Sequence, residues 1–166
     1  RRVEPGTGYV VRDDAADPAA TSDPLTVPSL TDHPDPGFYE AQQIGDGYGY
    51  IEMRDGTLLA ATVRLPGPIE DGPYPTVIEY SGYNPASPYE IEPTIGIYGQ
   101  LGWATVDVNM RGSGCSGGAF DYFEPLQSID GYDVIEAIAA QDWVFENQKT
   151  ITPENLASKI HGFLAD

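Results

Sequence analysis

The sequence is short of basic residues, cysteine and long apolar runs, and each shortage excludes a class of protein. Eight Lys and Arg face 26 Asp and Glu, which gives a formal net charge of -18. Because a surface this negative repels phosphate backbones and anionic headgroups, we expect neither nucleic acid nor membrane-surface partners. No run approaches the ~18 apolar residues of a transmembrane helix. The single cysteine, Cys115, cannot form an intrachain disulfide and leaves the redox compartment undetermined.

The length of 166 residues suits one ordinary domain, since a domain of about this size buries roughly 70% of its unfolded surface. The chain starts with Arg1 rather than Met, so we expect that a segment upstream has been removed or omitted. A signal peptide stays open, and an extracytoplasmic location is slightly favoured. Residues 1–46 are rich in Pro and Asp and lack periodic apolar pattern. They predict an extended arm or linker, with an upstream β domain left open.

Residues 47–144 predict an α/β layer architecture that opens with a hairpin. The stretches YGYIEM and TLLAATVRLP flank an Asp-Gly dipeptide, the strongest signal for a two-residue hairpin turn. Residues 76–80 and 103–110 then predict two buried strands, with a short helix between them that begins at Pro93 and ends at Gly102. Strands joined through a helical crossover are most simply parallel neighbours.

Two more helices are expected in the last part of the chain. An amphipathic helix at about residues 127–141 carries Ile135 and Ile138 on its apolar face and Asp130 and Asp133 in its early turns, where they suit the helix dipole. Residues 145–166 break the α/β rhythm and predict a divergent helical tail.

Residues 111–118, RGSGCSGG, follow the second buried strand and match two catalytic patterns. From Gly112 the match is G-x-G-x-x-G, the dinucleotide-binding fingerprint, and from Gly114 it is G-x-S-x-G, the nucleophile elbow of serine hydrolases. The fingerprint needs a helix directly after the glycines and an acidic residue after the next strand. AFDYFEP intervenes instead, and Pro125 is expected to bar an early helix.

The elbow needs a strand that runs straight into the serine and a helix that starts at once. Arg, Gly and Ser separate the strand from the pattern, and no helix is expected directly after it. A triad in the right chain order is nevertheless available: Ser116, Asp133 or Asp142, and His161. We favour a third interpretation, a structural glycine-rich loop at the carboxyl end of a strand, which still lies on the functional rim of an α/β sheet.

Two longer stretches carry a family resemblance. DVNMRGSGCSGGAFDYFEPLQSIDGYDVIEAIAAQDWV resembles the D-x-x-x-RGxGxSGG segment and following helix of the X-Pro dipeptidyl-peptidase and cocaine-esterase (CocE/NonD) family of serine hydrolases. RDGTLLAATVRLPGP and GPYPTVIEYSGYNP are similar to the family's opening hairpin and third strand. The resemblance covers about residues 48–144. It implies the N-terminal half of an α/β-hydrolase domain, and hydrolysis of acyl esters or X-Pro peptide bonds by a Ser-Asp-His triad without a metal or organic cofactor.

The resemblance also assigns one site residue and leaves others out. Tyr83 of SGYNP matches the tyrosine whose hydroxyl helps to form the oxyanion hole, a donor aimed where negative charge develops on the attacked carbonyl. After QDWV the family continues through a strand into G-x-S-Y, whereas this sequence has FENQKTITPENLASKIHGFLAD. The elbow and the later acid and histidine are therefore absent. His161 and His33 have no family counterpart and are expected on the surface.

Three functions remain open. The favoured one is a truncated or degenerate serine hydrolase, the second a noncatalytic binding or interaction module, and the third a minimal hydrolase that uses Ser116. The expected partners are a small ester or peptide substrate for the complete domain, a complementing polypeptide, or a second copy. Self-association is expected through residues 76–80, whose strand would lie next to the missing elbow strand.

Overall fold

The computed structural model describes residues 4–16, 18–27, 29, 32–83, 85–89, 93–121 and 124–145. The chain forms two compact units, Arg1–Pro34 and Asp35–Asp166. The first unit contains two antiparallel strand pairs, β1 with β4 and β2 with β3. These strands are short: β1 (Gly6–Tyr9), β2 (Arg12–Asp13), β3 (Ala20–Thr21) and β4 (Leu25–Val27). Most of their side chains are exposed, so this unit has little core of its own.

The boundary between the units lies after Pro34 rather than after residue 46, where composition predicted it. Helix α1 (Pro36–Glu40) begins directly after the boundary, with the Asp35 carboxylate capping its first turn. Tyr39 of this helix and Ile44 after it are buried in the core of the second unit. Phe38 beside Tyr39 also packs against this core, so residues 35–46, which were expected to be part of the arm, belong to the second unit.

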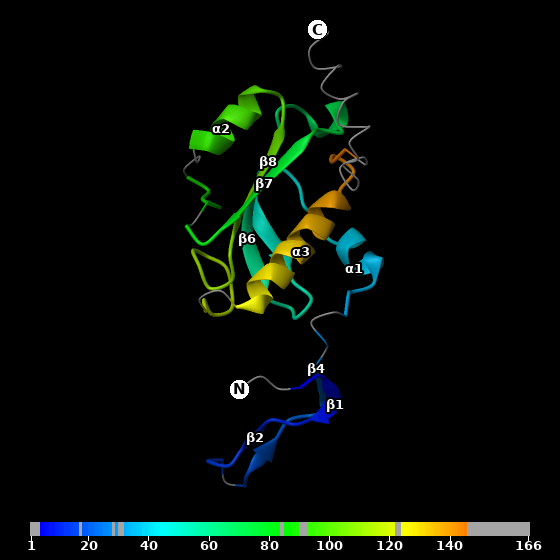
Figure 1. Ribbon diagram of the computed structural model, residues 1–166, viewed down its shortest axis with the longest axis vertical. Helices are drawn as coiled ribbons and strands as arrows, with labels where there is room; N and C mark the ends of the chain where they lie inside the picture. Colours follow the sequence, from blue (N-terminus) through cyan, green and yellow to red (C-terminus); the bar gives the residue numbers. More distant parts are fainter. Residues whose placement is uncertain are drawn as a thin grey trace. The chain divides into compact units, whose positions relative to one another are not determined.

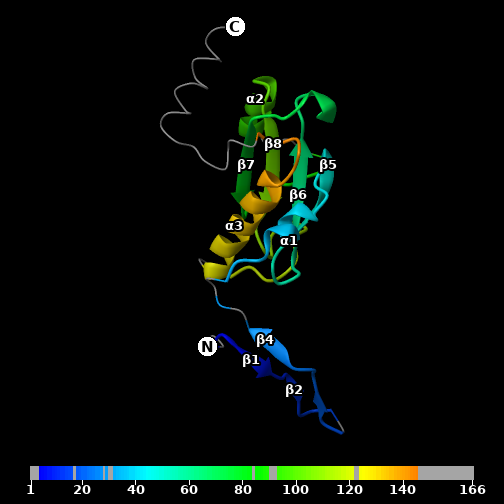
Figure 2. The same ribbon diagram turned by 90° about the vertical axis from the view of Figure 1, so that its right-hand side faces the viewer.

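The second unit is built on a four-stranded mixed sheet. Its strands lie in the order β5-β6-β8-β7, with β7 and β8 parallel and the other pairs antiparallel (Figure 2). Their bounds are β5 (Gly47–Glu52), β6 (Leu58–Arg64), β7 (Thr76–Ser81) and β8 (Ala104–Asn109). A short 3-10 helix, η1 (Ile69–Asp71), connects β6 to β7. The predicted hairpin and the predicted parallel pair are both confirmed.

Two helices flank the sheet on opposite sides. Helix α2 (Pro93–Gln100) connects β7 to β8 on one face, and α3 (Pro125–Ala139) packs with α1 on the other (Figure 1). The main core lies under α3, where Val134, Ala137 and Ile138 meet the inward side chains of β5, β6 and β8. None of the helices in the described part of the chain is long and apolar enough to span a bilayer.

Two details of α3 differ from the expectation. The helix begins at Pro125, because a proline at the first helical position needs no intrahelical N–H bond and already has a helical φ. Ile135, expected on the apolar face, is 55% exposed, while Asp130 and Asp133 are buried. The apolar face is therefore rotated relative to the prediction, and the two carboxylates face the sheet.

Candidate functional site

The glycine-rich loop after β8 is closed by its own backbone and docked on the hairpin. Gly112 N–H donates to Gly117 O at 2.8 Å, and Gly117 N–H donates to Leu58 O at 2.8 Å. Gly112 has a φ of +71°, and a Cβ there would lie 2.0 Å from the backbone nitrogen of Phe120. The loop runs on to Asp121 without entering a helix. This geometry fits neither a dinucleotide fingerprint nor a nucleophile elbow, and it agrees with the structural-loop interpretation.

The hydroxyl of Ser116 is engaged within this loop. Its Oγ donates to Asn109 O at 2.7 Å and accepts from Ala60 N–H at 2.8 Å. Both bonds are to backbone groups, so Ser116 joins the loop to the last residue of β8 and to the third residue of β6. The other members of the sequence-level triad are not brought to it: Asp133 is bound to Arg54 and Tyr39, Asp142 is exposed, and His161 lies outside the described residues.

Arg111 fixes the start of the loop through all five of its N–H groups. Nε and Nη2 donate to the two oxygens of Asp130 at 2.8 and 2.7 Å. Nη1 donates to Asp55 at 2.9 Å and to Thr57 Oγ1 at 2.8 Å, and Nη2 also reaches Asp55 at 3.2 Å. No N–H is left to bind a substrate. Arg111 therefore ties the loop to α3 and to the hairpin turn.

The ionisation of these groups follows from their contacts. The hydrogen bond to Asp130 raises the pKa of Arg111 above its ordinary value, against the opposing effect of burial. Burial acts to raise the pKa of Asp55, but hydrogen bonds from Arg111 and Thr57 outweigh it and leave the pKa lowered. Burial raises the pKa of Asp130 in spite of Arg111. The charged groups of this cluster are paired with one another, which is typical of a structural ion-pair network.

A second ion pair joins α3 to the hairpin, through Asp133 and Arg54. Asp133 accepts from Arg54 Nη2 at 2.6 Å and from the Tyr39 hydroxyl at 2.7 Å. Burial raises the pKa of Tyr39, and its hydrogen bond to Asp133 raises it further. Neither of the two ion pairs, Arg111 with Asp130 and Arg54 with Asp133, was predicted from the sequence. The available signal was the placement of Asp130 and Asp133 three residues apart beside the apolar stripe of a helix, in a chain with only eight basic residues.

Tyr83 lies just past the carboxyl end of β7. Its side chain is 97% exposed, and its backbone N–H donates to Ser81 Oγ at 3.0 Å. Ser81 O in turn accepts from Met110 N–H at 2.9 Å, which ties the end of β7 to the residue after β8. A Cβ on Gly82 would lie 3.3 Å from the Phe120 ring, so the glycine-rich loop borders the turn that carries Tyr83. Ligands of α/β sheets bind at this edge.

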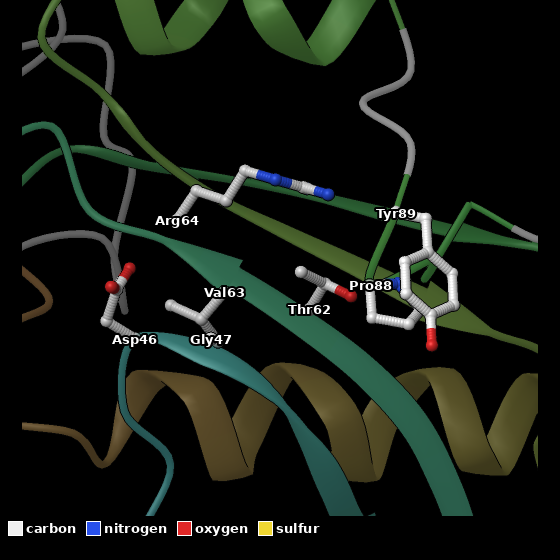
Figure 3. Close-up of a pocket in the computed structure, with 7 residues that line it drawn as sticks. All are labelled: Asp46, Gly47, Thr62, Val63, Arg64, Pro88 and Tyr89. Carbon is white, nitrogen blue, oxygen red and sulfur yellow. The ribbon is translucent and has the colours of Figure 1, made fainter.

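A shallow groove of about 330 Å³ lies over β6, near the segment 85–89 (Figure 3). Its residues are Asp46, Gly47, Thr62, Val63, Arg64, Pro88 and Tyr89. Arg64 forms an ion pair with the buried Asp107 and donates through Nη2 to Ser87 O at 3.3 Å. The groove contains none of the residues that the sequence assigned to a site. In the described residues there is also no group of three or more His, Cys, Asp or Glu that would hold a metal ion.

The comparisons with known proteins agree on the family. A sequence profile of the X-Pro dipeptidyl-peptidase (S15) family matches residues 55–148. Two solved structures of a CocE/NonD family hydrolase from Staphylococcus aureus are similar to this chain, one at 27% identity with a TM-score of 0.52, the other at 28% with 0.50. Each alignment covers 59% of this chain, but 20% and 21% of the S. aureus chains. No curated protein matches.

These matches confirm the resemblance drawn from RGSGCSGG and SGYNP. The sheet order, the parallel β7-β8 pair and the crossover helix form part of an α/β-hydrolase fold, and the chain spans about a fifth of the length of the S. aureus hydrolase. The family profile covers more than half of the sequence. The chain belongs to the X-Pro dipeptidyl-peptidase (S15) family of hydrolases.

Proposed function

We propose that this chain supplies the N-terminal half of an α/β-hydrolase domain that hydrolyses acyl esters or X-Pro peptide bonds, with Tyr83 as an oxyanion-hole donor. The observation that carries the proposal is the position of Tyr83 at the carboxyl end of β7, with its side chain 97% exposed beside the glycine-rich loop. An oxyanion donor must reach the carbonyl of a bound substrate, and an exposed phenol at this edge is free to do so.

Among the described residues, we propose a catalytic role for Tyr83 alone. When a nucleophile attacks the carbonyl carbon, the carbonyl oxygen becomes an oxyanion, and the Tyr83 hydroxyl donates a hydrogen bond to it. The Ser116 hydroxyl is bound to backbone groups and the Asp133 carboxylate to Tyr39 and Arg54, so we infer that the catalytic serine, acid and histidine lie outside the described residues. We therefore propose that the chain is a truncated or degenerate member of its family.

An activity assay tests this proposal. The purified chain should neither hydrolyse p-nitrophenyl acetate above a heat-denatured control nor react with a fluorophosphonate probe. A fusion that supplies the remaining segment of the S. aureus hydrolase should do both. A folded fusion without activity contradicts the proposal. Probe labelling of the isolated chain at Ser116, lost in Ser116→Ala, would favour a minimal hydrolase instead.

A second candidate is a noncatalytic interaction module that keeps the hydrolase half-sheet. The observation that favours it is β7, which is an outer strand of the sheet as far as the structure describes it and is half-buried along its whole length. Outer strands with little charge pair readily with other chains. This module would bind a second polypeptide with its Tyr83 unused, so Tyr83→Phe would leave its binding unchanged.

A further inference from the structure

The side chain of Asn109, the last residue of β8, hydrogen-bonds to the backbone of Ala86, in the loop that carries Tyr83. The Asn109 side chain is fully buried, at 0% exposure. Its Oδ1 accepts from Ala86 N–H at 2.9 Å, and its Nδ2 donates to Ala86 O at 3.2 Å. A side-chain amide that bonds both groups of one residue replaces the partner that a neighbouring strand would provide. The loop is thereby attached to the sheet at Ala86, which is itself buried.

The attachment at Ala86 is one of two that flank Tyr83. On the other side, Ser81 is held by Met110 and accepts the Tyr83 N–H. With its side chain almost fully exposed, Tyr83 gains little from packing. The direction of its phenol therefore depends on how firmly the backbone is held at Ser81 and at Ala86.

Asn109 also reaches the other loop of this rim. Its backbone carbonyl accepts from Ser116 Oγ at 2.7 Å, within the glycine-rich loop. One buried residue thus holds the Tyr83 loop through its side chain and the glycine-rich loop through its backbone. The two loops border each other at Gly82 and Phe120.

We propose that Asn109 is the positioning residue of the oxyanion site, because its side chain clamps Ala86 and thereby fixes the turn that presents Tyr83. This inference rests on the proposed function of Tyr83. It adds that the geometry of the donor is set from the end of the neighbouring strand. Because its side chain is fully buried, Asn109 would act through the loop rather than by contact with a substrate.

The variant Asn109→Asp tests the clamp through pH. A protonated carboxyl donates to Ala86 O and accepts from Ala86 N–H, so it replaces the amide. The ionised form has no donor and turns an oxygen toward the Ala86 carbonyl. As pH rises from about 5 to about 8 through the raised pKa of a buried carboxyl, hydrogen-exchange protection of the Ala86 and Tyr83 amides should fall by about tenfold or more. NMR measures this on the full chain, and the wild type should show no such fall after correction for intrinsic exchange.

Matched variants separate the clamp from a general effect on folding. Asn109→Leu should expose the same two amides at every pH. Val108→Ala, on the adjacent core-facing residue, should lower the melting temperature without a selective effect on them. Unchanged protection at Ala86 and Tyr83 in both Asn109 variants overturns the inference, and so does a loss spread evenly over the sheet.

A wild-type measurement covers the case in which the Asn109 variants do not fold. The Asn109 side-chain NH2 protons and the Ala86 amide should then exchange as slowly as the amides of β8. Fast exchange of the Ala86 amide beside a protected β8 would refute the clamp. Because no substrate is involved, failure here removes the role of Asn109 and leaves that of Tyr83 to the activity assay.

Discussion

Two hydroxyl groups at the carboxyl edge of the sheet, those of Tyr83 and Ser116, differ in what they are free to do. Ser116 Oγ bonds two backbone groups, one as donor and one as acceptor. Tyr83 is held only through its backbone N–H, and its phenol is exposed. A group already bonded to the backbone cannot respond to a substrate without breaking those bonds. At the scale of single residues, the phenol is therefore the group available for chemistry.

Tyr83→Phe should slow the hydrolysis that we propose and leave the fold intact. In a fusion that carries the rest of the hydrolase domain, we expect kcat to fall by about 100-fold or more, the effect of losing one oxyanion donor. The melting temperature should not change, because the hydroxyl is exposed. Steady-state kinetics with p-nitrophenyl acetate measure this. A wild-type kcat in the variant would reduce Tyr83 to a turn residue.

Ser116→Ala should act on stability instead. The change removes the hydrogen bonds of Ser116 to Ala60 N–H and Asn109 O, which should cost about 1–3 kcal/mol in the free energy of unfolding. Ser113→Ala is the matched control, because Ser113 Oγ makes one bond, to Met110 O at 2.8 Å. Urea denaturation of the isolated chain compares the two variants. Equal losses would show that the bridge at Ser116 adds nothing beyond a single hydrogen bond.

At the scale of elements, the glycine-rich loop requires glycine for space as well as for backbone conformation. Gly112 and Gly56 have similar φ values, +71° and +80°. A Cβ built on Gly112 would lie 2.0 Å from the backbone nitrogen of Phe120, whereas a Cβ built on Gly56 would have no heavy atom within 4 Å. Gly56→Ala should cost about 1–2 kcal/mol, whereas Gly112→Ala should cost more than about 4 kcal/mol. Chemical denaturation measures both, and similar losses would contradict the crowding.

The cluster of Arg111, Asp130, Asp55 and Thr57 joins the glycine-rich loop to α3 and to the hairpin turn, which lies more than 50 residues earlier in the chain. Lysine keeps the charge but offers three donors on one atom, so it cannot form both sides of the fork to Asp130 and Asp55. Arg111→Lys should therefore destabilise the fold by about 2–3 kcal/mol. Arg12→Lys is the control, because the pair of Arg12 with Asp14 is exposed and should contribute less than about 1 kcal/mol. An equal effect of both changes would contradict the cluster's role.

The sequence revealed those elements whose signals are local. An Asp-Gly turn between two alternating stretches and a helix between two apolar stretches predicted β5 to β8 within a few residues. It did not reveal contacts over long separations. Trp143 Nε1 donates to Ile44 O at 2.7 Å across 99 positions, which holds residues 41–46 on the core. Tyr83 was assigned to the site only by family resemblance, and its role stays a prediction, since one tyrosine among 11 has no distinguishing pattern of its own.

At the scale of the whole molecule, two features have opposite effects on self-association: the net charge disfavours it, and the outer strand β7 favours it. A net charge of -18 keeps copies apart. Yet β8 is buried at every residue, whereas its neighbour β7 is half-buried at every residue. On the far side of β7, the described residues supply one isolated parallel bridge, between Tyr74 and Val144 just before the strand begins. The apolar residues Val77, Ile78 and Tyr80 then follow in the strand itself.

We predict that the isolated chain self-associates through β7 or folds only in part. Outer strands with few charged residues pair with other chains, and β7 carries one, Glu79. At physiological ionic strength the repulsion between copies is screened beyond about 8 Å. Sedimentation velocity on the wild type and on Val77→Lys measures the effect. Association should be present in the first and weaker in the second, and it should grow with added salt.

Tyr50→Lys on the opposite outer strand β5 identifies which edge is used, since Tyr50 is 50% exposed and lies outside the core. If β7 is the contact, this change leaves association unaltered; if association is lost only in Tyr50→Lys, the contact lies on β5. A monomeric wild type with one sharp cooperative melt would contradict self-association altogether. The chain would then fold as an independent domain, and the proposal that it needs a further strand would lose its physical basis.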